Sequence, residues 1–373
     1  MIVAGGDMYM MDTHTCHFFA HTGPSSRNGA RPHRTRAYTL EARLVVRFSY
    51  RIYRVDIVQM DLRDRYRGAL LGLATGDALG TTLEFKPPGS FEPISDMLGG
   101  GPFNLKPGQW TDDTSMALCL AESLIEHQAF DAADQMARYI RWWREGHLSS
   151  IGKCFDIGNT VSAALRDFEA QGKPFSGSTH ERSAGNGSLM RLAPIPMAYR
   201  SHEDRWQFAS DSSATTHGAR ACLSACGFYS ELIARALCGA SKADILNTGN
   251  IPVGLLKSGA CDKIKAIAEG SYKQRNPPEI KGTGYVVDAL EAALWAFHRS
   301  NSFREGALLA VILGDVADTT GAIYGQLAGA YYGRSGIPGH WLELISQAPL
   351  IENYADALLQ LSNSHQKPGT DHH

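Results

Sequence analysis

Residues 68–80 read Gly-Ala-Leu-Leu-Gly-Leu-Ala-Thr-Gly-Asp-Ala-Leu-Gly, so a glycine returns at every fourth position. In an α-helix this spacing places the four glycines on one face. Each glycine costs about 1 kcal/mol relative to alanine inside a helix, so another interaction must compensate. The same spacing returns from Gly321 to Gly333. Because close backbone approach is the usual reason for such glycines, we expect two tightly packed helices, either against each other or around a central site.

Helical periodicity continues through the rest of the chain after Asp61, interrupted by loops rich in glycine and proline. Strand patterns are weak throughout. We predict helices at residues 62–79, 116–127, 130–145, 159–170, 206–211, 219–237, 242–247, 263–272, 286–297 and 303–313. The expected architecture is therefore a single large all-α domain and not a series of βαβ units.

The first sixty residues differ in composition from the rest. Every permanently basic residue among them is arginine, and four histidines occur among glycine, proline, serine and threonine. We interpret residues 1–60 as a poorly structured N-terminal extension outside the working fold, or as the product of a misassigned start. A short strand is expected at residues 44–58. The all-α domain is assigned to residues 61–363, followed by a C-terminal tail at residues 364–373.

Composition limits the kinds of partner that the chain is expected to bind. The chain has 373 residues, a hydrophobic content of 43% and a formal net charge of −2. A charge so close to zero argues against nucleic acid or an anionic membrane as an obligatory partner. No apolar run reaches the roughly 18 residues that a membrane-spanning helix needs. The seven cysteines form no CxxC pair, which favours a reducing, cytoplasmic setting over a disulfide framework.

Two clusters carry hard oxygen ligands. Residues 111–114 read Thr-Asp-Asp-Thr, and residues 315–320 read Asp-Val-Ala-Asp-Thr-Thr. Carboxylates and hydroxyls suit Mg²⁺ or Mn²⁺, whereas zinc prefers cysteine and histidine. Adjacent carboxylates raise each other's pKa unless a cation or hydrogen-bond donors hold them. Each cluster alone could be a helix N-cap with acids in the first turn, but two such clusters in one chain favour a shared ion.

Five ordered blocks of sequence then resemble a known family. They are residues 76–85, 109–114, 156–160, 185–188 and 315–325. From about residue 61 to residue 345 the chain is similar to ADP-ribosylglycohydrolases, in particular to the dinitrogenase-reductase-activating branch. The resemblance implies an all-α fold with two Mg²⁺ or Mn²⁺ ions. It also implies hydrolysis of the bond between C1 of the ADP-ribose ribose and a protein side chain, arginine or serine.

The resemblance also implies roles for individual residues, carried over by position in the matching blocks. The metal ligands would be Thr111, Asp112, Asp113, Asp318 and Thr319. The catalytic groups would be Glu84, Asp156 and Asp113, and the substrate-binding residues Asn159, Gly185, Asn186, Gly187, Ser188, His217 and Tyr285. The expected partner is an ADP-ribosylated protein or a small ADP-ribose conjugate.

The chemistry supports these assignments independently, although each has a simpler alternative. Cleavage of a glycosidic bond needs an oriented water, an acid or base, and groups that fix the ribose. A glycine-rich loop offers backbone N–H groups to phosphate oxygens. However, Glu84 could be a surface acid, Asp156 could cap the following helix, residues 185–188 could form an ordinary turn, and His217 and Tyr285 could be structural.

One residue departs from the family pattern. The second cluster normally offers an acid, any residue, a second acid and a hydroxyl, and the first of these acids falls on Val316. A valine side chain cannot bind a metal, and the neighbouring Asp315 should point elsewhere. We therefore expect one of the two ions to bind weakly and turnover to be reduced.

Two other functions stay open at this point. The first is an ADP-ribose-binding relative in which catalysis has decayed at Val316. The second is an isoprenoid-type synthase, which is also all-α and Mg²⁺-dependent. That class needs carboxylates about one helical turn apart, whereas Asp112 and Asp113 are adjacent, so it is the weaker alternative.

Overall fold

The computed structural model describes residues 62–201, 203–247, 249 and 261–365. The predicted strand at residues 44–58 and the N-terminal extension lie outside the described residues. Within the described part of the chain, β-type pairing is limited to isolated bridges between single residues. The prediction of an all-α fold is therefore confirmed.

The chain enters this fold through a helix over residues 62–80, called the first helix below. The helices that follow are α2 (Asp112–His127), α3 (Ala132–Glu145), α4 (Asn159–Gln171), α5 (Pro194–Ala198), α6 (Arg205–Ala214), α7 (Arg220–Leu237), α8 (Lys242–Ile245), α10 (Asp262–Ala268), α11 (Val286–Arg299), α12 (Phe303–Val311), α13 (Ala317–Tyr332), α14 (Gly339–Leu344) and α15 (Ala348–Ser364). Short 3-10 turns occur at Glu181–Ser183, Ser271–Lys273 and Arg334–Gly336.

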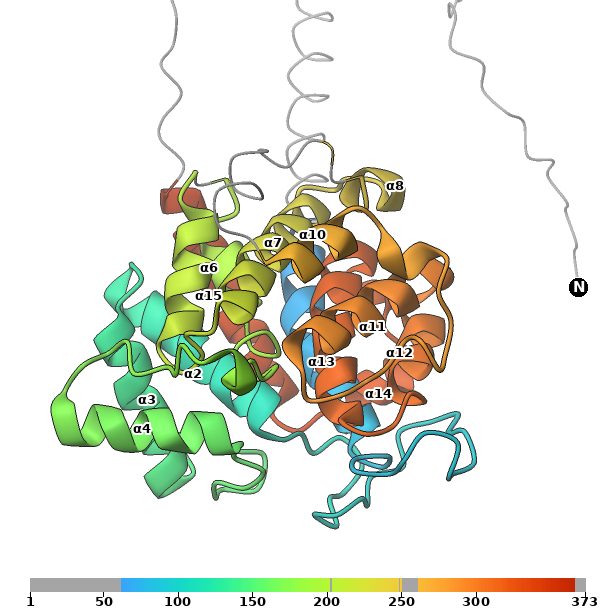
Figure 1. The fold of residues 1–373 in the computed structure, drawn as a ribbon, viewed down its shortest axis with the longest axis horizontal. Helices are drawn as coiled ribbons and strands as arrows, with labels where there is room; N and C mark the ends of the chain where they lie inside the picture. Colours follow the sequence, from blue (N-terminus) through green and yellow to red (C-terminus); the bar gives the residue numbers. More distant parts are fainter. Residues whose placement is uncertain (1–61, 202, 248, 250–260, 366–373) are drawn as a thin grey trace, which may run out of the picture. The chain divides into compact units, whose positions relative to one another are not determined.

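The first helix and α13 pack backbone to backbone through their glycines. A Cβ placed at Gly68, Gly72 or Gly76 would lie no more than 2.4 Å from the carbonyl oxygen of Gly329, Gly325 or Gly321, respectively. As the residue number rises along the first helix, the partner's number falls, so the two helices run antiparallel. The expected tight packing of two glycine-faced helices is confirmed, and Figure 1 shows the first helix beside α13.

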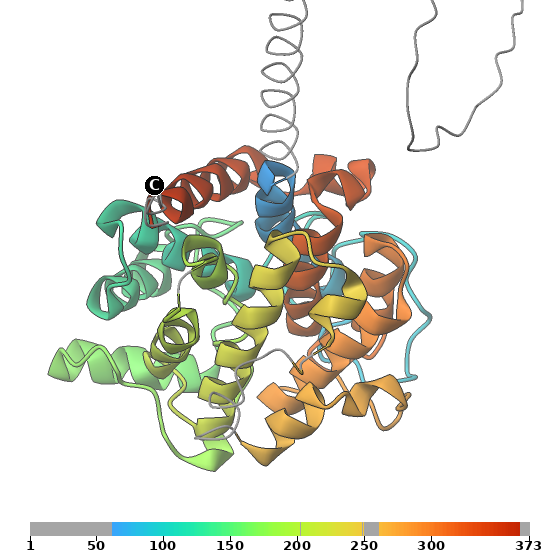
Figure 2. The ribbon, with the colours of Figure 1, turned by 90° about the horizontal axis from the view of Figure 1, so that it is seen from above.

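Other helices surround this pair. Figure 2 shows the first helix obliquely, with α7 and α15 next to it. The Arg65 guanidinium donates to the Ala236 carbonyl oxygen of α7 at 3.2 Å. Arg63 and Arg67 both form ion pairs with Asp356 of α15. The glycine-faced pair is thus enclosed on the sides that its glycines do not occupy.

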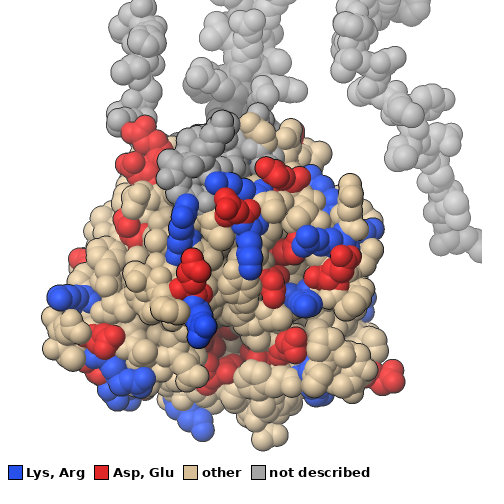
Figure 3. Space-filling view, viewed as in Figure 1, with Lys and Arg blue, Asp and Glu red and all other residues tan. Residues whose placement is uncertain are grey.

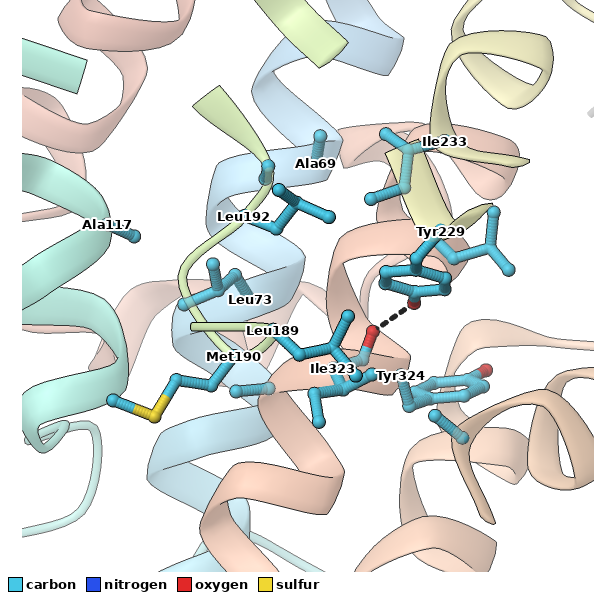
Figure 4. Close-up of a cluster of buried hydrophobic side chains, with 14 of the residues drawn as sticks. Ala69, Leu73, Ala117, Leu189, Met190, Leu192, Tyr229, Ile233, Ile323 and Tyr324 are labelled. Carbon is cyan, nitrogen blue, oxygen red and sulfur yellow. Dashed lines mark hydrogen bonds between the residues drawn. The ribbon is translucent and has the colours of Figure 1, made fainter. Parts of the chain in front are cut away.

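The buried core also holds the segment that follows residues 185–188. Figure 4 shows Leu189, Met190 and Leu192 of this segment among side chains of the first helix, α7 and α13. The Gln326 side chain of α13 accepts a hydrogen bond from the Ala193 backbone N–H at 2.7 Å and donates to the carbonyl oxygens of Leu189 and Met190. The buried Gln326 therefore anchors to α13 the segment that follows residues 185–188, which are called the glycine-rich loop below.

Some boundaries differ from those expected. Helix α2 begins four residues earlier than predicted, at Asp112, because the acidic pair is itself helical. Helix α15 was not predicted, although its buried residues Ile351, Ala355 and Leu358 have helical spacing. Its N-terminal proline occupies the first turn, where the missing N–H is tolerated.

Replacing Gly72 with alanine tests the backbone contact. The new methyl group would collide with the Gly325 carbonyl oxygen, whereas Gly339, which begins α14, has no atom within 4 Å of its Cβ position. We expect Gly72→Ala to lower the free energy of unfolding by about 1–3 kcal/mol. The control Gly339→Ala should leave it unchanged or raise it slightly. Denaturant unfolding measures both, and equal stability of the two variants would contradict the proposed contact.

Candidate metal and substrate site

The antiparallel helix pair brings the two acidic clusters together. At its end, a Cβ on Gly80 would collide with the backbone of Ala317 and Asp318. The turn after the first helix carries Glu84, whose carboxylate accepts a hydrogen bond from the Asp318 backbone N–H at 3.2 Å. The hydroxyl of Thr319 lies 3.4 Å from Asp113 Oδ2, at the start of α2. Three chain segments that are remote in sequence therefore converge at one place.

Asp77 of the first helix organises the start of α2. Its carboxylate accepts hydrogen bonds from the backbone N–H groups of Thr111 and Thr114, at 2.9 and 3.1 Å. The hydroxyls of the same two threonines donate to it at 3.0 and 2.6 Å. Asp77 thus caps α2 from another helix, which orients Thr111, Asp112 and Asp113. Sequence reasoning assigned no role to Asp77, although an acid on a glycine-faced helix was a usable signal.

The donor set fits a hard divalent cation. Carboxylate oxygens of Asp77, Asp113 and Asp318 all lie within 4.8 Å of one another, and all three residues are buried. Asp113 Oδ1 and Asp318 Oδ2 are buried with no hydrogen-bond partner among the described residues. Since unsatisfied buried carboxylate oxygens are costly, and since Mg²⁺ and Mn²⁺ prefer such ligands, the residues present suit one of these ions.

Electrostatics lead to the same conclusion. Burial raises the pKa of Asp112 and Asp113 well above the usual value, and neighbouring carboxylates raise it further. Burial and the charge of Asp318 raise the pKa of Asp77 to about 7 and that of Asp156 to about 9. The pKa of Glu84 is raised by the same two causes. A bound cation would relieve this repulsion.

A cavity of about 310 Å³ opens beside the acids. Its wall includes Glu84, Asp112, Asp156, Asn159, Gly185, Asn186, Gly187, His217, Val316, Asp318 and Thr319, and none of its described lining residues is lysine or arginine. Thr111 and Asp113 are buried behind this wall. In Figure 3, acidic side chains lie in a hollow below the centre of the face shown.

The glycine-rich loop forms the other part of the wall, directly over His217. A Cβ on Gly187 would lie 2.8 Å from the imidazole, and one on Gly185 would lie 3.4 Å from Nε2. Not every predicted substrate residue lines this cavity. The Ser188 hydroxyl faces the core, where it accepts a hydrogen bond from Ser213 at 2.8 Å. Tyr285 lines a neighbouring cavity of about 540 Å³ that shares Thr160, Gly185 and Gly284 with the first.

The protonation of His217 follows from its partners. Arg191 donates to the Thr216 hydroxyl at 2.8 Å, which leaves the hydrogen of this hydroxyl available to His217 Nδ1, also 2.8 Å away. With the hydroxyl as donor, the imidazole hydrogen is on Nε2. Burial lowers the pKa of His217 to about 3, which makes the ring a neutral hydrogen-bond donor and a poor general base near pH 7.

The structure also shows where Val316, the residue that departs from the family pattern, lies. Val316 lines the cavity, and its backbone N–H donates to the Gly282 carbonyl oxygen at 2.9 Å. Asp315 is absent from both the cavity wall and the group of three converging acids. Its backbone instead pairs with residues 85 and 86 through hydrogen bonds of 2.7 and 2.9 Å. Asp315 therefore does not contribute to the described wall of the cavity.

Comparison with known proteins agrees with this geometry. The family model for ADP-ribosylglycohydrolase matches residues 58–368. An ADP-ribosylarginine hydrolase Tri1 from Serratia proteamaculans is 41% identical over 307 residues, which cover 82% of each chain. Its namesake from Pseudomonas putida is 44% identical, covering 79% of this chain and 78% of that protein.

A more distant relative and a solved structure extend the comparison. The ADP-ribosyl-[dinitrogen reductase] glycohydrolase of Rhodospirillum rubrum is 31% identical, covering 81% of this chain and 97% of that one. A solved ADP-ribosylglycohydrolase-related protein complex contains a chain that is 45% identical, with a TM-score of 0.72. The match covers 81% of this chain and 99% of that one.

Metal removal should make stability depend on pH. Because the pKa values of Asp77 and Asp156 are higher in the folded than in the unfolded protein, ionisation of these acids opposes folding. Without divalent metal, the melting temperature should fall as the pH rises from about 4 to 9. Saturating Mn²⁺ should flatten this dependence. Thermal melts with EDTA or Mn²⁺ measure it, and identical profiles would exclude a cation at these acids.

Proposed function

This chain belongs to the ADP-ribosylglycohydrolase family, and we propose that it is a divalent-metal-dependent hydrolase that releases ADP-ribose from arginine side chains of modified proteins. The observation that carries the proposal is the convergence of buried carboxylates from α2 and α13, in which Asp113 and Asp318 each keep an oxygen without a hydrogen-bond partner among the described residues, beside a cavity lined by Asp112 and Asp318. Such a cluster is costly in a folded protein unless it binds cations. Family membership removes the isoprenoid-synthase alternative.

The metal centre would be held by Asp113 and Asp318, with Thr111, Asp112 and Thr319 beside them. When bound, Mg²⁺ or Mn²⁺ supplies Lewis-acid contact to ribose hydroxyls and lowers the pKa of a bound water. Asp77 has a different role in this proposal. Four hydrogen bonds from Thr111 and Thr114 already occupy its carboxylate, so it positions the ligands of α2.

The substrate would lie along the cavity with its diphosphate at the glycine-rich loop. The Gly187 backbone N–H and the His217 imidazole are suitable donors to phosphate oxygens, whereas the N–H groups of Gly185 and Asn186 already donate to the Ser183 and Gly284 carbonyl oxygens. The ribose then reaches the acidic end of the cavity, where Asn159 and Asp156 line the wall. The two ends of the cavity therefore match the diphosphate and the terminal ribose of ADP-ribose.

Glu84 and Asp156 are the proposed acid–base groups. In the reaction, the bond between ribose C1 and the guanidine nitrogen breaks, and that nitrogen gains a proton. Water adds to C1 and gives up a proton, so the reaction is balanced. Both acids line the cavity, and burial raises the pKa of each, so that each can hold a proton at neutral pH and give it to the leaving nitrogen. The arginine acceptor rests on the names of the two relatives that are 41% and 44% identical.

Val316 favours a second candidate, an ADP-ribose-binding protein with weak or lost catalysis. Its side chain lines the cavity beside Asp318 and Thr319 and offers no ligand atom. Without a carboxylate at this position, one of the two ions expected from the family would bind weakly. Binding of ADP-ribose at the loop end of the cavity does not depend on this residue.

The assay that tests the proposed function measures ADP-ribose released from arginine-linked and serine-linked ADP-ribosylated proteins, with and without Mn²⁺. We expect Mn²⁺-dependent release from the arginine-linked substrate. Asp113→Asn removes a charge from the proposed metal ligands and should reduce turnover by at least about 100-fold. Asp315→Asn, outside the cavity wall, should stay within twofold of the wild type. Unchanged activity in Asp113→Asn would refute the assigned metal centre.

Restoring the missing carboxylate tests the role of Val316. Val316→Asp should strengthen the weaker Mn²⁺ site by about 10-fold or more, as measured by calorimetric titration, and turnover should rise with it. Val316→Asn, similar in shape but uncharged, is the matched control and should give a smaller gain. Two tight Mn²⁺ sites in the wild-type protein would show that Val316 does not weaken the centre.

A further inference from the structure

Three phenylalanines pack ring against ring, and one of them, Phe85, lines the cavity. Phe85 and Phe103 pack edge to face with ring centroids 6.3 Å apart, and Phe103 and Phe155 do the same at 5.3 Å. Phe85 immediately follows Glu84, and Phe155 immediately precedes Asp156. Phe85 and Phe155 are thus sequence neighbours of the two proposed acid–base groups, and Phe85, Phe103 and Phe155 are called the aromatic rim below.

Phe85 occupies a position that packing alone does not explain. Its side chain is 60% exposed and lines the cavity. Its backbone has a φ of 60°, a left-handed conformation that is unfavourable for a bulky residue and is typical of strained functional sites. Hydrogen bonds with Asp315 hold it there, since the Phe85 N–H donates to the Asp315 carbonyl oxygen at 2.7 Å.

The neighbouring loop fixes the second ring. The Thr82 hydroxyl donates to the Gly99 carbonyl oxygen at 2.9 Å, and Gly101 packs directly on the Thr81 carbonyl oxygen. Backbone hydrogen bonds between Gly100 and Leu105 close the turn that carries Phe103. The aromatic rim is thus built on anchored backbone beside the cavity.

We infer that the aromatic rim binds the guanidinium group of the arginine acceptor. This inference rests on the proposed function, in which the diphosphate lies at the glycine-rich loop and the scissile bond at Glu84 and Asp156. The acceptor must then leave the cavity past these acids, where the aromatic rim lies. Aromatic faces attract a guanidinium cation, and the acidic wall, with no lysine or arginine among its described residues, attracts the same charge. A serine acceptor carries no cation for the rim to bind.

Substitutions at Phe85 separate this role from a purely apolar one. Phe85→Leu keeps the apolar character but removes the ring, whereas Phe85→Tyr keeps the ring. We expect Phe85→Leu to lower kcat/KM for an arginine-linked peptide about 5- to 10-fold, and Phe85→Tyr to stay within twofold of the wild type. Phe103→Leu is the second variant and should also lower kcat/KM.

Three controls define the expected selectivity. The Kd for free ADP-ribose, which lacks an acceptor, should be unchanged in every variant, as should kcat/KM for any turnover of a serine-linked peptide. Phe175→Ala, a similarly exposed phenylalanine at 54% that does not line the cavity, should have no effect. Loss of affinity for free ADP-ribose in parallel, or wild-type kcat/KM in both leucine variants, would overturn the inference.

Failure of the proposed function would give a different result. If the wild-type protein released no ADP-ribose from the arginine-linked peptide, hydrolysis itself would be excluded. The Kd of the intact conjugate relative to that of free ADP-ribose would still test the aromatic rim. If Phe85→Leu weakened binding of the conjugate more than binding of free ADP-ribose, the proposed role of the aromatic rim would be supported. Equal Kd ratios in wild type and variant would refute this role.

Discussion

The structure depends on the backbone contact between the first helix and α13. Glycines at four-residue intervals allow the two helices to approach so closely that any Cβ on the contacting face would collide with a carbonyl oxygen. The antiparallel contact also fixes their register. Because Gly80 then lies against Ala317 and Asp318, the acids after the first helix must meet the acids that begin α13. The same glycines that lower helix propensity therefore determine where the candidate metal centre forms.

This arrangement concentrates negative charge where the protein has little means to neutralise it. Asp77 is satisfied by the hydrogen bonds of two threonines, whereas Asp113 and Asp318 each keep a buried oxygen without a partner among the described residues. Ion pairs do occur elsewhere, such as that of the buried Arg138 with Glu122 and Asp134. Within the described part of the chain, the acids at the cavity have no such partner, so a divalent cation is the simplest source of compensation.

Much of the fold could be predicted from the sequence, because apolar periodicity and glycine spacing are local signals. The two acidic clusters were also recognisable, since ligand chemistry depends on residue type. Asp77 was missed because its role arises from hydrogen bonds to a different helix. The aromatic rim left no sequence signal either, as Phe85, Phe103 and Phe155 come together only through tertiary structure. Val316, by contrast, could be recognised in the sequence as a departure from the family pattern. Its effect on metal binding could not be predicted, because that effect depends on how an ion is held beside it.

The central claim is that carboxylates of α2 and α13 share one divalent cation. A crystal structure with Mn²⁺, with data collected at the manganese absorption edge, tests it most directly. The account predicts an anomalous peak within about 2.5 Å of carboxylate oxygens of both Asp113 and Asp318. Ordered density for both side chains with no manganese peak between them would contradict it.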